Sequence, residues 1–167
     1  RLADVPRKAV LNLFADSRYH LKVNGTFVGY GPARFFPSEP EYDSYDIAPH
    51  LRRGENVIAV QVVWHGMSTF QQPMNKPGFV AWGQARPNRG RAVSFDTPGQ
   101  WKCRKARGYD QTAPKFSFTS SAIDVFDARK DPPDWDRPGA KLSGWKTPVE
   151  IAWQDAWGRL RRRSIPH

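Results

Sequence analysis

The chain has 167 residues, a formal net charge of +10, 39% hydrophobic residues and 13% aromatic residues, with seven Trp. This length favours one domain with a single sizeable core. No apolar run approaches the roughly 18 residues that a membrane helix needs, so we expect no membrane partner. Fifteen Pro and thirteen Gly favour short strands joined by tight turns over long helices.

Cys103 is the single cysteine, so the chain forms no internal disulfide and must hold together by core packing. A catalytic thiol would need a His partner that the sequence does not place. The opening "RLADVPRKAV" lacks the basic and then apolar order of a signal peptide.

The first strands show clear alternation. Residues 9–15 (AVLNLFA) alternate apolar and polar side chains, as a half-buried strand does. In 18–23 (RYHLKV), the apolar side chains of Tyr19, Leu21 and Val23 face one way, while His20 and Lys22 face the other. We therefore expect two strands with one face each on a core.

The stretch "YHLKVNGTFVGYG" contains Asn24-Gly25-Thr26, which has three interpretations. It matches a glycosylation acceptor, it could be a loop tip that reaches a ligand, and it places Asn-Gly between two alternating runs. A type I′ turn needs positive φ at both central residues, which favours Asn-Gly. We therefore assign Asn24 and Gly25 a structural role at the tip of a hairpin, and contact between this tip and a neighbouring domain stays open.

Further elements follow along the chain. After a long loop and a short strand, Asp46 is placed to cap a helical turn at 47–51. The run 56–66 (NVIAVQVVWHG) has few polar breaks, so we expect a central strand covered on both faces. We expect further strands in 79–85, 100–106 and 122–129, and a turn followed by a strand in 87–95. Eight to ten short strands with long aromatic loops predict an all-β jelly-roll β-sandwich.

Several of these segments resemble those of a known family of domains. "ADSRYHLKVNGTFVGYG" followed by "YDSYDIAPHLRRGENVIAVQVVWHG" resembles the N-terminal, galactose-binding-like jelly-roll domain of bacterial α-L-rhamnosidases, glycoside hydrolase family 78. The same order of residues also resembles the sugar-binding domains of family 2 glycosidases. By itself this half indicates a galactose-binding-like sandwich attached to a glycosidase.

The second half resembles the rhamnosidases more specifically. "PGQWKCRKA" is similar to their Asp-x-x-Trp-Lys strand, and "IDVFDARKDPPDW" to a Tyr-Asp-Ala-Arg segment. "SGWKTPVEI" resembles a later strand, and "LRRRSIPH" a passage that leads out of the domain. Two departures are Val125-Phe126, where the family has a Gly-Glu and Tyr context, and "VWHGMSTF" in place of a Gly-Trp-Tyr motif.

The resemblance implies that residues 1–167 form a single sandwich domain, an excerpt of a longer bacterial glycosidase, with 158–167 as an exit linker. It implies an inverting parent enzyme whose acid and base lie in a separate (α/α)6 barrel, the main expected partner. We expect this chain to be non-catalytic, to need no cofactor and to support the barrel. The compartment, cytoplasmic or exported, stays open.

Two alternatives remain. The chain could be an independent carbohydrate-binding module for rhamnose or galactose, or the sugar-binding domain of a family 2 glycosidase. Sugar rings stack on aromatic side chains while polar groups meet their hydroxyls. The candidates for carbohydrate contact or a domain interface are Trp64, His65, Phe70 and Trp82. Core packing of Trp64 and Trp82 is the alternative for those two.

Two polar groups complete the candidates. Asp127 and Arg129 belong to the most family-like triplet, and we expect a buried structural pair or a brace against the barrel. The loop "PSEPEYDSYD" carries Glu41, Asp43 and Asp46, which are weak candidates for a Ca²⁺ site because hard cations prefer oxygen ligands. Turn and capping roles are the alternative.

The positive charge raises the question of nucleic acid. Basic residues cluster at 86–91, 102–107 and 159–163, but none of these clusters lies on a known recognition helix, zinc finger or RNA-binding motif. A basic face that docks on an acidic neighbouring domain, or solvated charge, explains the clusters more simply. We therefore expect no nucleic-acid partner.

Overall fold

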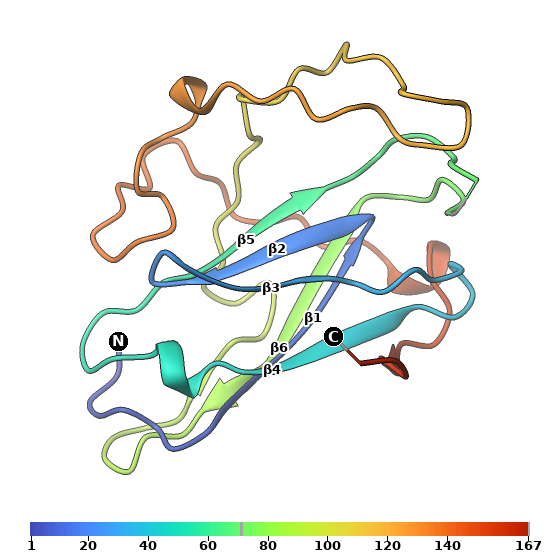
Figure 1. The fold of residues 1–167 in the computed structure, drawn as a ribbon. Coiled ribbons are helices and arrows are strands. Elements are labelled where there is room, and N and C mark those ends of the chain that lie inside the picture. The colour runs from blue at the N-terminus through green and yellow to red at the C-terminus, as the bar shows by residue number, and fades with distance from the viewer. Residues whose placement is uncertain (71, 167) are drawn as a thin grey trace.

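The computed structural model describes residues 1–70 and 72–166, and the fold within them is almost entirely β-structure (Figure 1). Its eight strands are β1 (Ala9–Asp16), β2 (Arg18–Val23), β3 (Thr26–Gly31), β4 (Glu41–Asp46), β5 (Ile58–Val63), β6 (Gly78–Ala85), β7 (Val93–Ser94) and β8 (Arg161–Arg162). Three single turns of 3₁₀ helix complete the elements: η1 (Ala48–His50), η2 (Ala128–Lys130) and η3 (Trp153–Asp155).

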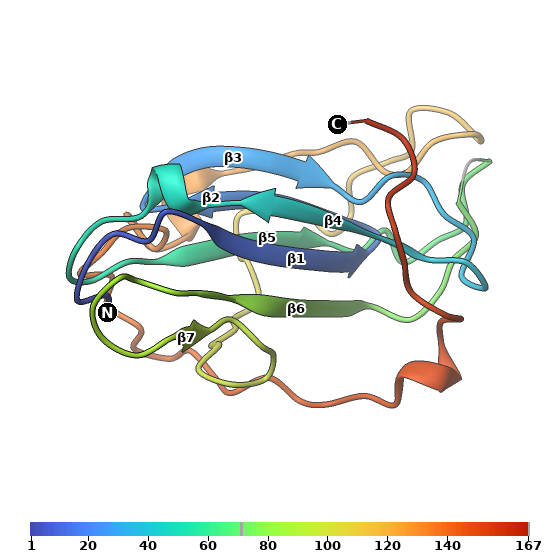
Figure 2. The same cartoon turned by 90° about the horizontal axis from the view of Figure 1, so that it is seen from below.

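The strands form two sheets. One has the order β7-β6-β1-β4-β8 and the other the order β3-β2-β5. All pairs are antiparallel except β4 with β8, which is parallel. The sheets face each other as two layers (Figure 2). This arrangement confirms the predicted all-β jelly-roll β-sandwich.

The core lies between the two sheets. It contains Leu11 and Leu13 of β1 and Leu21 and Val23 of β2, all with 0% exposure. The alternation predicted for the first two strands is therefore confirmed. β1 lies inside its sheet and is also covered on its outer face, where Phe14 packs in a second apolar cluster.

The Asn-Gly hairpin is confirmed. Asn24 has φ 53° and Gly25 has φ 81°, so both central residues adopt the positive φ of a type I′ turn. The Asn24 side chain donates from Nδ2 to the backbone oxygen of His50 at 2.8 Å and accepts from the N–H of Val57 at 2.9 Å. Asn24 therefore joins the hairpin tip to the chain around η1 and β5.

The turn predicted after Asp46 is also present. Oδ1 of Asp46 accepts hydrogen bonds from the backbone N–H groups of Ala48, in η1, and Ala9, in β1. These two bonds lower the pKa of the Asp46 carboxyl, and the bond from Ala9 has the larger effect. Asp46 thus starts the turn and fixes it against the first strand.

The prediction that 56–66 is a central strand covered on both faces is wrong. β5 is shorter, Ile58–Val63, and lies at the edge of the three-stranded sheet. Only Ala59 is buried in it, and Val62 is 39% exposed. A mostly apolar run also suits an edge strand when other segments of the chain partly cover that strand.

The strands predicted at 100–106 and 122–129 are wrong as well. Each segment makes only isolated bridges, Cys103 with Lys146, Lys115 with Ala122 and Tyr109 with Phe126. Exposed side chains such as Val125, at 45%, give this part of the chain no buried face to set a strand register.

Instead, residues 109–136 lie over the outer face of the three-stranded sheet (Figure 1, yellow to orange). The contacts are polar. On β2, Arg18 pairs with Asp124 at 2.6 Å and Lys22 pairs with Asp136 at 2.7 Å. On β5, the Gln61 amide donates to the Tyr109 hydroxyl at 3.0 Å. We call residues 109–136 the outer layer.

The last segment of the chain, 158–166, also lies against the sandwich (red in Figure 2). β8 pairs with Glu41 and Tyr42 of β4, and Trp157, just before it, is buried and donates to Asp16 at the end of β1. The segment for which we expected an exit linker is thus bound to the five-stranded sheet as far as it is described. His167 lies outside the described residues.

Across the described residues, the three helical turns are far too short to cross a lipid bilayer.

Candidate functional site

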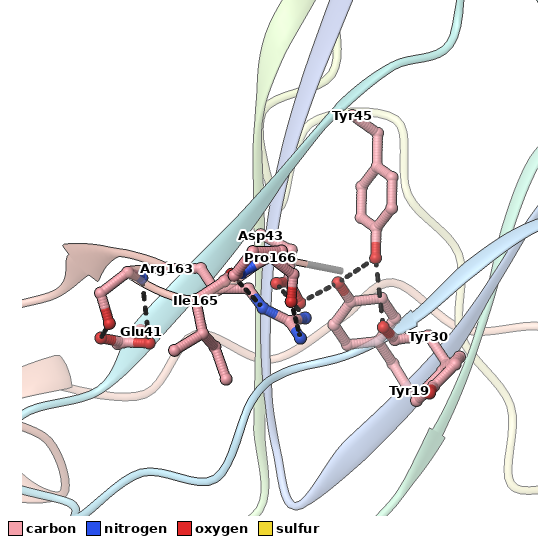
Figure 3. Close-up of polar contacts among 9 residues, drawn as sticks. Tyr19, Tyr30, Glu41, Asp43, Tyr45, Arg163, Ile165 and Pro166 are labelled. Atoms are coloured by element: carbon pink, nitrogen blue, oxygen red, sulfur yellow. Dashed lines mark hydrogen bonds and ion pairs between the residues drawn. The ribbon is translucent and has the colours of Figure 1, made fainter.

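A buried polar network joins the two sheets to the last segment of the chain (Figure 3). Asp43 of β4 is 0% exposed. One of its oxygens accepts from the Tyr19 hydroxyl of β2 at 2.5 Å, and the other accepts from Nη1 of Arg163 at 3.0 Å. The network thus connects three parts of the chain that are distant in sequence.

Gly31 makes room for this network. It lies opposite Tyr19 in the β2–β3 pair, and a Cβ atom there would lie 2.0 Å from Oδ2 of Asp43. The hydroxyl groups of Tyr19 and Tyr45 are 3.0 Å apart. Burial raises the pKa of Tyr45 to about 12 and raises that of Tyr19 further. Both phenols therefore stay protonated near neutral pH and act as structural hydrogen-bonding groups.

The three acidic residues considered for calcium have protein partners. Glu41 accepts from the Ser164 hydroxyl at 2.9 Å, Asp43 belongs to the network above, and Asp46 accepts the two backbone N–H groups. No group of three or more His, Cys, Asp or Glu side chains within residues 1–70 and 72–166 is arranged to hold a metal ion. Calcium binding by these residues stays a prediction.

Trp64 and His65 follow the end of β5. Trp64 is 43% exposed and its indole donates to the backbone oxygen of Asn75 at 2.8 Å. The His65 backbone N–H donates to the Ser17 hydroxyl at 3.1 Å. Burial lowers the pKa of the His65 imidazole, and the charge of Arg18 lowers it further by a smaller amount. The imidazole is therefore neutral at physiological pH.

Beside His65 lies a buried carboxyl that sequence reasoning missed. Asp16 is 1% exposed and its Oδ2 accepts from the Trp157 indole at 3.0 Å. Burial raises the pKa of Asp16, while hydrogen bonds with Trp157, Ser17 and Asn75 oppose the rise. With its hydrogen bonds made inside the protein, this carboxyl anchors the final segment to β1.

Phe70 belongs to a group of exposed apolar side chains on two neighbouring loops. The Phe70 backbone N–H donates to the oxygen of Thr119 at 3.2 Å, which joins the two loops at that point. We define the loop patch as Trp64, Phe70, Met74, Phe116 and Phe118, with exposures from 43% to 86%. Two of the four predicted aromatic and polar candidates, Trp64 and Phe70, are therefore exposed and lie in the same stretch between β5 and β6.

Trp82 lies elsewhere. It is on β6 and packs edge-on against Tyr42 of β4, with ring centroids 4.7 Å apart. Asp127 and Arg129 do form the predicted ion pair, at 2.8 Å, but it is not buried, because the Arg129 side chain is 89% exposed. Asp127 also accepts the Arg129 backbone N–H, so the pair closes the η2 turn.

A cavity of about 310 Å³ opens between β5 and β7, at an edge of the sandwich. Its lining includes Trp101, Trp135 and Trp145, and we call it the Trp cavity. The Trp145 Nε1 atom is buried and has no hydrogen-bond partner in the described part of the chain. These Trp residues are spread over 45 positions without periodicity, so no sequence pattern brings them together.

Comparisons with known proteins identify relatives of this fold. The family model described as "Alpha-L-rhamnosidase N-terminal domain" matches residues 5–165. The structure is similar to the family 78 rhamnosidase of Bacillus sp. GL1, with a TM-score of 0.83 and 36% identity. That match covers 99% of this chain and 17% of the Bacillus chain.

The α-L-rhamnosidase of Dictyoglumus thermophilum has the same fold, with a TM-score of 0.73 and 17% identity over 99% of this chain and 18% of its own. Among curated proteins, a β-galactosidase of Clostridium acetobutylicum is 45% identical over 47 residues, which are 28% of this chain and 5% of that protein. The chain thus spans a small fraction of the relatives that it matches.

Proposed function

Because the chain belongs to the family of α-L-rhamnosidase N-terminal domains, we propose that it is a non-catalytic domain that supports the catalytic domain of a larger rhamnosidase. The match covers only 17% of the Bacillus rhamnosidase chain, which supports the proposal that this chain is one domain of a multidomain enzyme. The proposal places the acid and base of the reaction outside this chain.

The observation that carries this proposal is the loop patch. Phe70, Phe116 and Phe118 are each more than 80% exposed and lie on loops that are hydrogen-bonded to each other. Soluble proteins seldom leave large apolar side chains together in water without a partner surface. An apolar face of the neighbouring catalytic domain would bury them.

The test uses the full-length protein with Phe70, Phe116 and Phe118 all replaced by Ser. These side chains lie outside the buried core, so we expect this domain to stay folded while the enzyme loses thermal stability and rhamnosidase activity together. Val149→Ser, at a position 88% exposed outside the loop patch, is the control. Unchanged activity and stability in the triple variant would contradict docking through the loop patch.

The Trp cavity favours a second candidate function, carbohydrate binding by this domain. Its volume lies near the lower end of the range for small-molecule sites, about 300–1,000 Å³. A sugar ring can stack on the indole faces that line the cavity. Both features suit rhamnose or galactose.

Calorimetry with L-rhamnose and with galactose, with and without EDTA, tests this function. Saturable binding that Trp145→Phe weakens would support a carbohydrate-binding domain. Binding that disappears only with EDTA would instead support the calcium prediction for Glu41, Asp43 and Asp46. If no binding is detected at millimolar sugar, support of the catalytic domain remains as the only proposed function.

A further inference from the structure

A second hollow lies beside the Trp cavity and has a different character. Its volume is about 650 Å³, and four of its lining residues are cationic while none is acidic. We call this hollow the cationic cleft; the cations are Arg104, Lys105, Arg107 and Lys146. Three of them come from one of the basic clusters in the sequence, and the fourth is 39 residues further along the chain.

The backbone forces these cations together. The N–H of Cys103 donates to the oxygen of Lys146 at 2.8 Å, and the N–H of Lys146 donates back at 2.9 Å. This bridge sets Lys146 against the segment that carries Arg104 and Lys105. Like charges held around one hollow repel each other, and an anion between them would relieve the repulsion.

The four cations lack acidic partners within the described residues. Seven ion pairs are formed there, and none includes a cation of the cleft. The carboxylate of Asp131 accepts the backbone N–H of Arg107 at 2.9 Å, not its guanidinium. Arg104 is half-buried, and Lys105 and Arg107 are exposed.

The position of the cleft indicates what kind of anion fits. Residues close to the Cys103–Lys146 bridge in sequence line the Trp cavity, since Trp145 directly precedes Lys146 and Trp101 lies two positions before Cys103. An anion site and an aromatic site thus adjoin. An acidic sugar combines both requirements, since its ring stacks on indole and its carboxylate accepts hydrogen bonds from guanidinium and ammonium groups.

We propose that the cationic cleft binds the carboxylate groups of an acidic saccharide, with the sugar units extending toward the Trp cavity. The choice of a saccharide over other polyanions rests on the proposed function in a glycoside hydrolase. The cleft itself is separate from the loop patch, so the two proposals can fail independently.

The test measures binding of trigalacturonate to the full-length protein by calorimetry at low and at physiological salt. The variant Arg104→Gln/Lys146→Gln removes two charges from the cleft. The matched control, Arg86→Gln/Arg89→Gln, removes two exposed charges of another basic cluster and gives the same net charge. Because hydrogen bonds between charged groups are the stronger ones and two of them are removed, we expect the cleft variant to bind at least tenfold more weakly.

We further expect the wild type to lose affinity as salt rises, because the Debye length shortens. Maltotriose, a neutral trisaccharide, should not compete. An equal loss of affinity in the control variant would show that binding depends on net charge alone, and it would overturn the proposal. Lack of trigalacturonate binding would overturn it too, as would equal affinity for a short DNA duplex. The variant with Phe70, Phe116 and Phe118 replaced by Ser should bind trigalacturonate like the wild type. A failure of domain docking can thus be distinguished from a failure of the cationic cleft to bind.

Discussion

The sandwich and the chain that follows β7 differ in how they use their apolar residues. Every buried hydrophobic residue among those described lies within positions 1–95, except Trp157. Between 96 and 156, several large apolar side chains are instead exposed, with Phe116 and Phe118 at 86% and Val149 at 88%, while the four Trp residues there are partly buried. The first region stabilises the fold, and the second presents surfaces.

The outer layer, residues 109–136, shows how the second region is held in place. Its contacts with β2 are the ion pairs of Arg18 with Asp124 and of Lys22 with Asp136. Partly exposed ion pairs contribute little, about 0.2–1 kcal/mol each. Loops that carry candidate binding surfaces can therefore change or move without loss of the core.

The largest effect is expected in the core. Leu13 of β1 is 0% exposed, so Leu13→Ala should cost about 2–5 kcal/mol of unfolding free energy through lost burial and a cavity. Chemical denaturation followed by Trp fluorescence measures this. Val149→Ala, in the second region, should change stability by less than about 0.5 kcal/mol. Similar losses in both variants would show that the two regions contribute equally to stability.

The network around Asp43 should give the next largest effect. Arg163→Met removes the guanidinium paired with the fully buried carboxylate, and the Arg163 side chain is itself only 16% exposed. A hydrogen bond to a charged group contributes about 1.5–3 kcal/mol, so we expect a loss of that size in denaturation.

The double variant Asp43→Asn/Arg163→Met tests the reason for this loss. If the cost comes from a buried charge that has lost its cation, removal of that charge should recover part of the stability. Equal stability of the single and double variants would show that Arg163 acts by packing alone.

The sandwich could be predicted from sequence because its signals are local. Alternation in β1 and β2 and the Asn-Gly pair fix strand faces and one turn without knowledge of distant residues. The edge position of β5 could not be predicted, because an apolar run indicates a hydrophobic strand but does not indicate whether that strand has a neighbour on each side.

The candidate sites could not be predicted in the same way. The Asp43 network needs Tyr19 and Arg163, which are 144 residues apart, and the cationic cleft needs the bridge between Cys103 and Lys146. Such contacts follow from tertiary packing and leave no periodic signal. The exposed loop patch was found in part, because Trp64 and Phe70 lie near the end of one strand.

Asp16 gives a pH-dependent effect inside the first region. Burial raises its pKa in the folded state above the unfolded value near 3.8. The folded state therefore holds the proton more tightly, and this contribution to stability is lost as pH rises through the folded pKa. Asp16→Asn cannot ionise, so its stability relative to the wild type should improve between pH 4 and pH 7.

Thermal unfolding at several pH values measures this trend. Asp110→Asn is the control, because hydrogen bonds from Thr112 lower the pKa of Asp110 and its contribution changes only at lower pH. A constant difference between Asp16→Asn and the wild type from pH 4 to pH 7 would contradict a raised pKa.

The smallest effect is expected at the junction of the two regions. Lys22→Met removes the ion pair with Asp136, in which the side chains are 37% and 11% exposed. Global stability should fall by only about 1 kcal/mol, because the methionine keeps the apolar stem and the Lys22 ammonium is partly in water, although the Asp136 carboxylate left behind is largely buried. Hydrogen exchange should nevertheless speed up within 109–136 and stay unchanged in β1, since only the outer layer loses a contact. Added salt should produce the same local change in the wild type and little further change in the variant. Faster exchange in β1 would mean that the outer layer and the sandwich unfold as one unit and that the two regions are not energetically distinct.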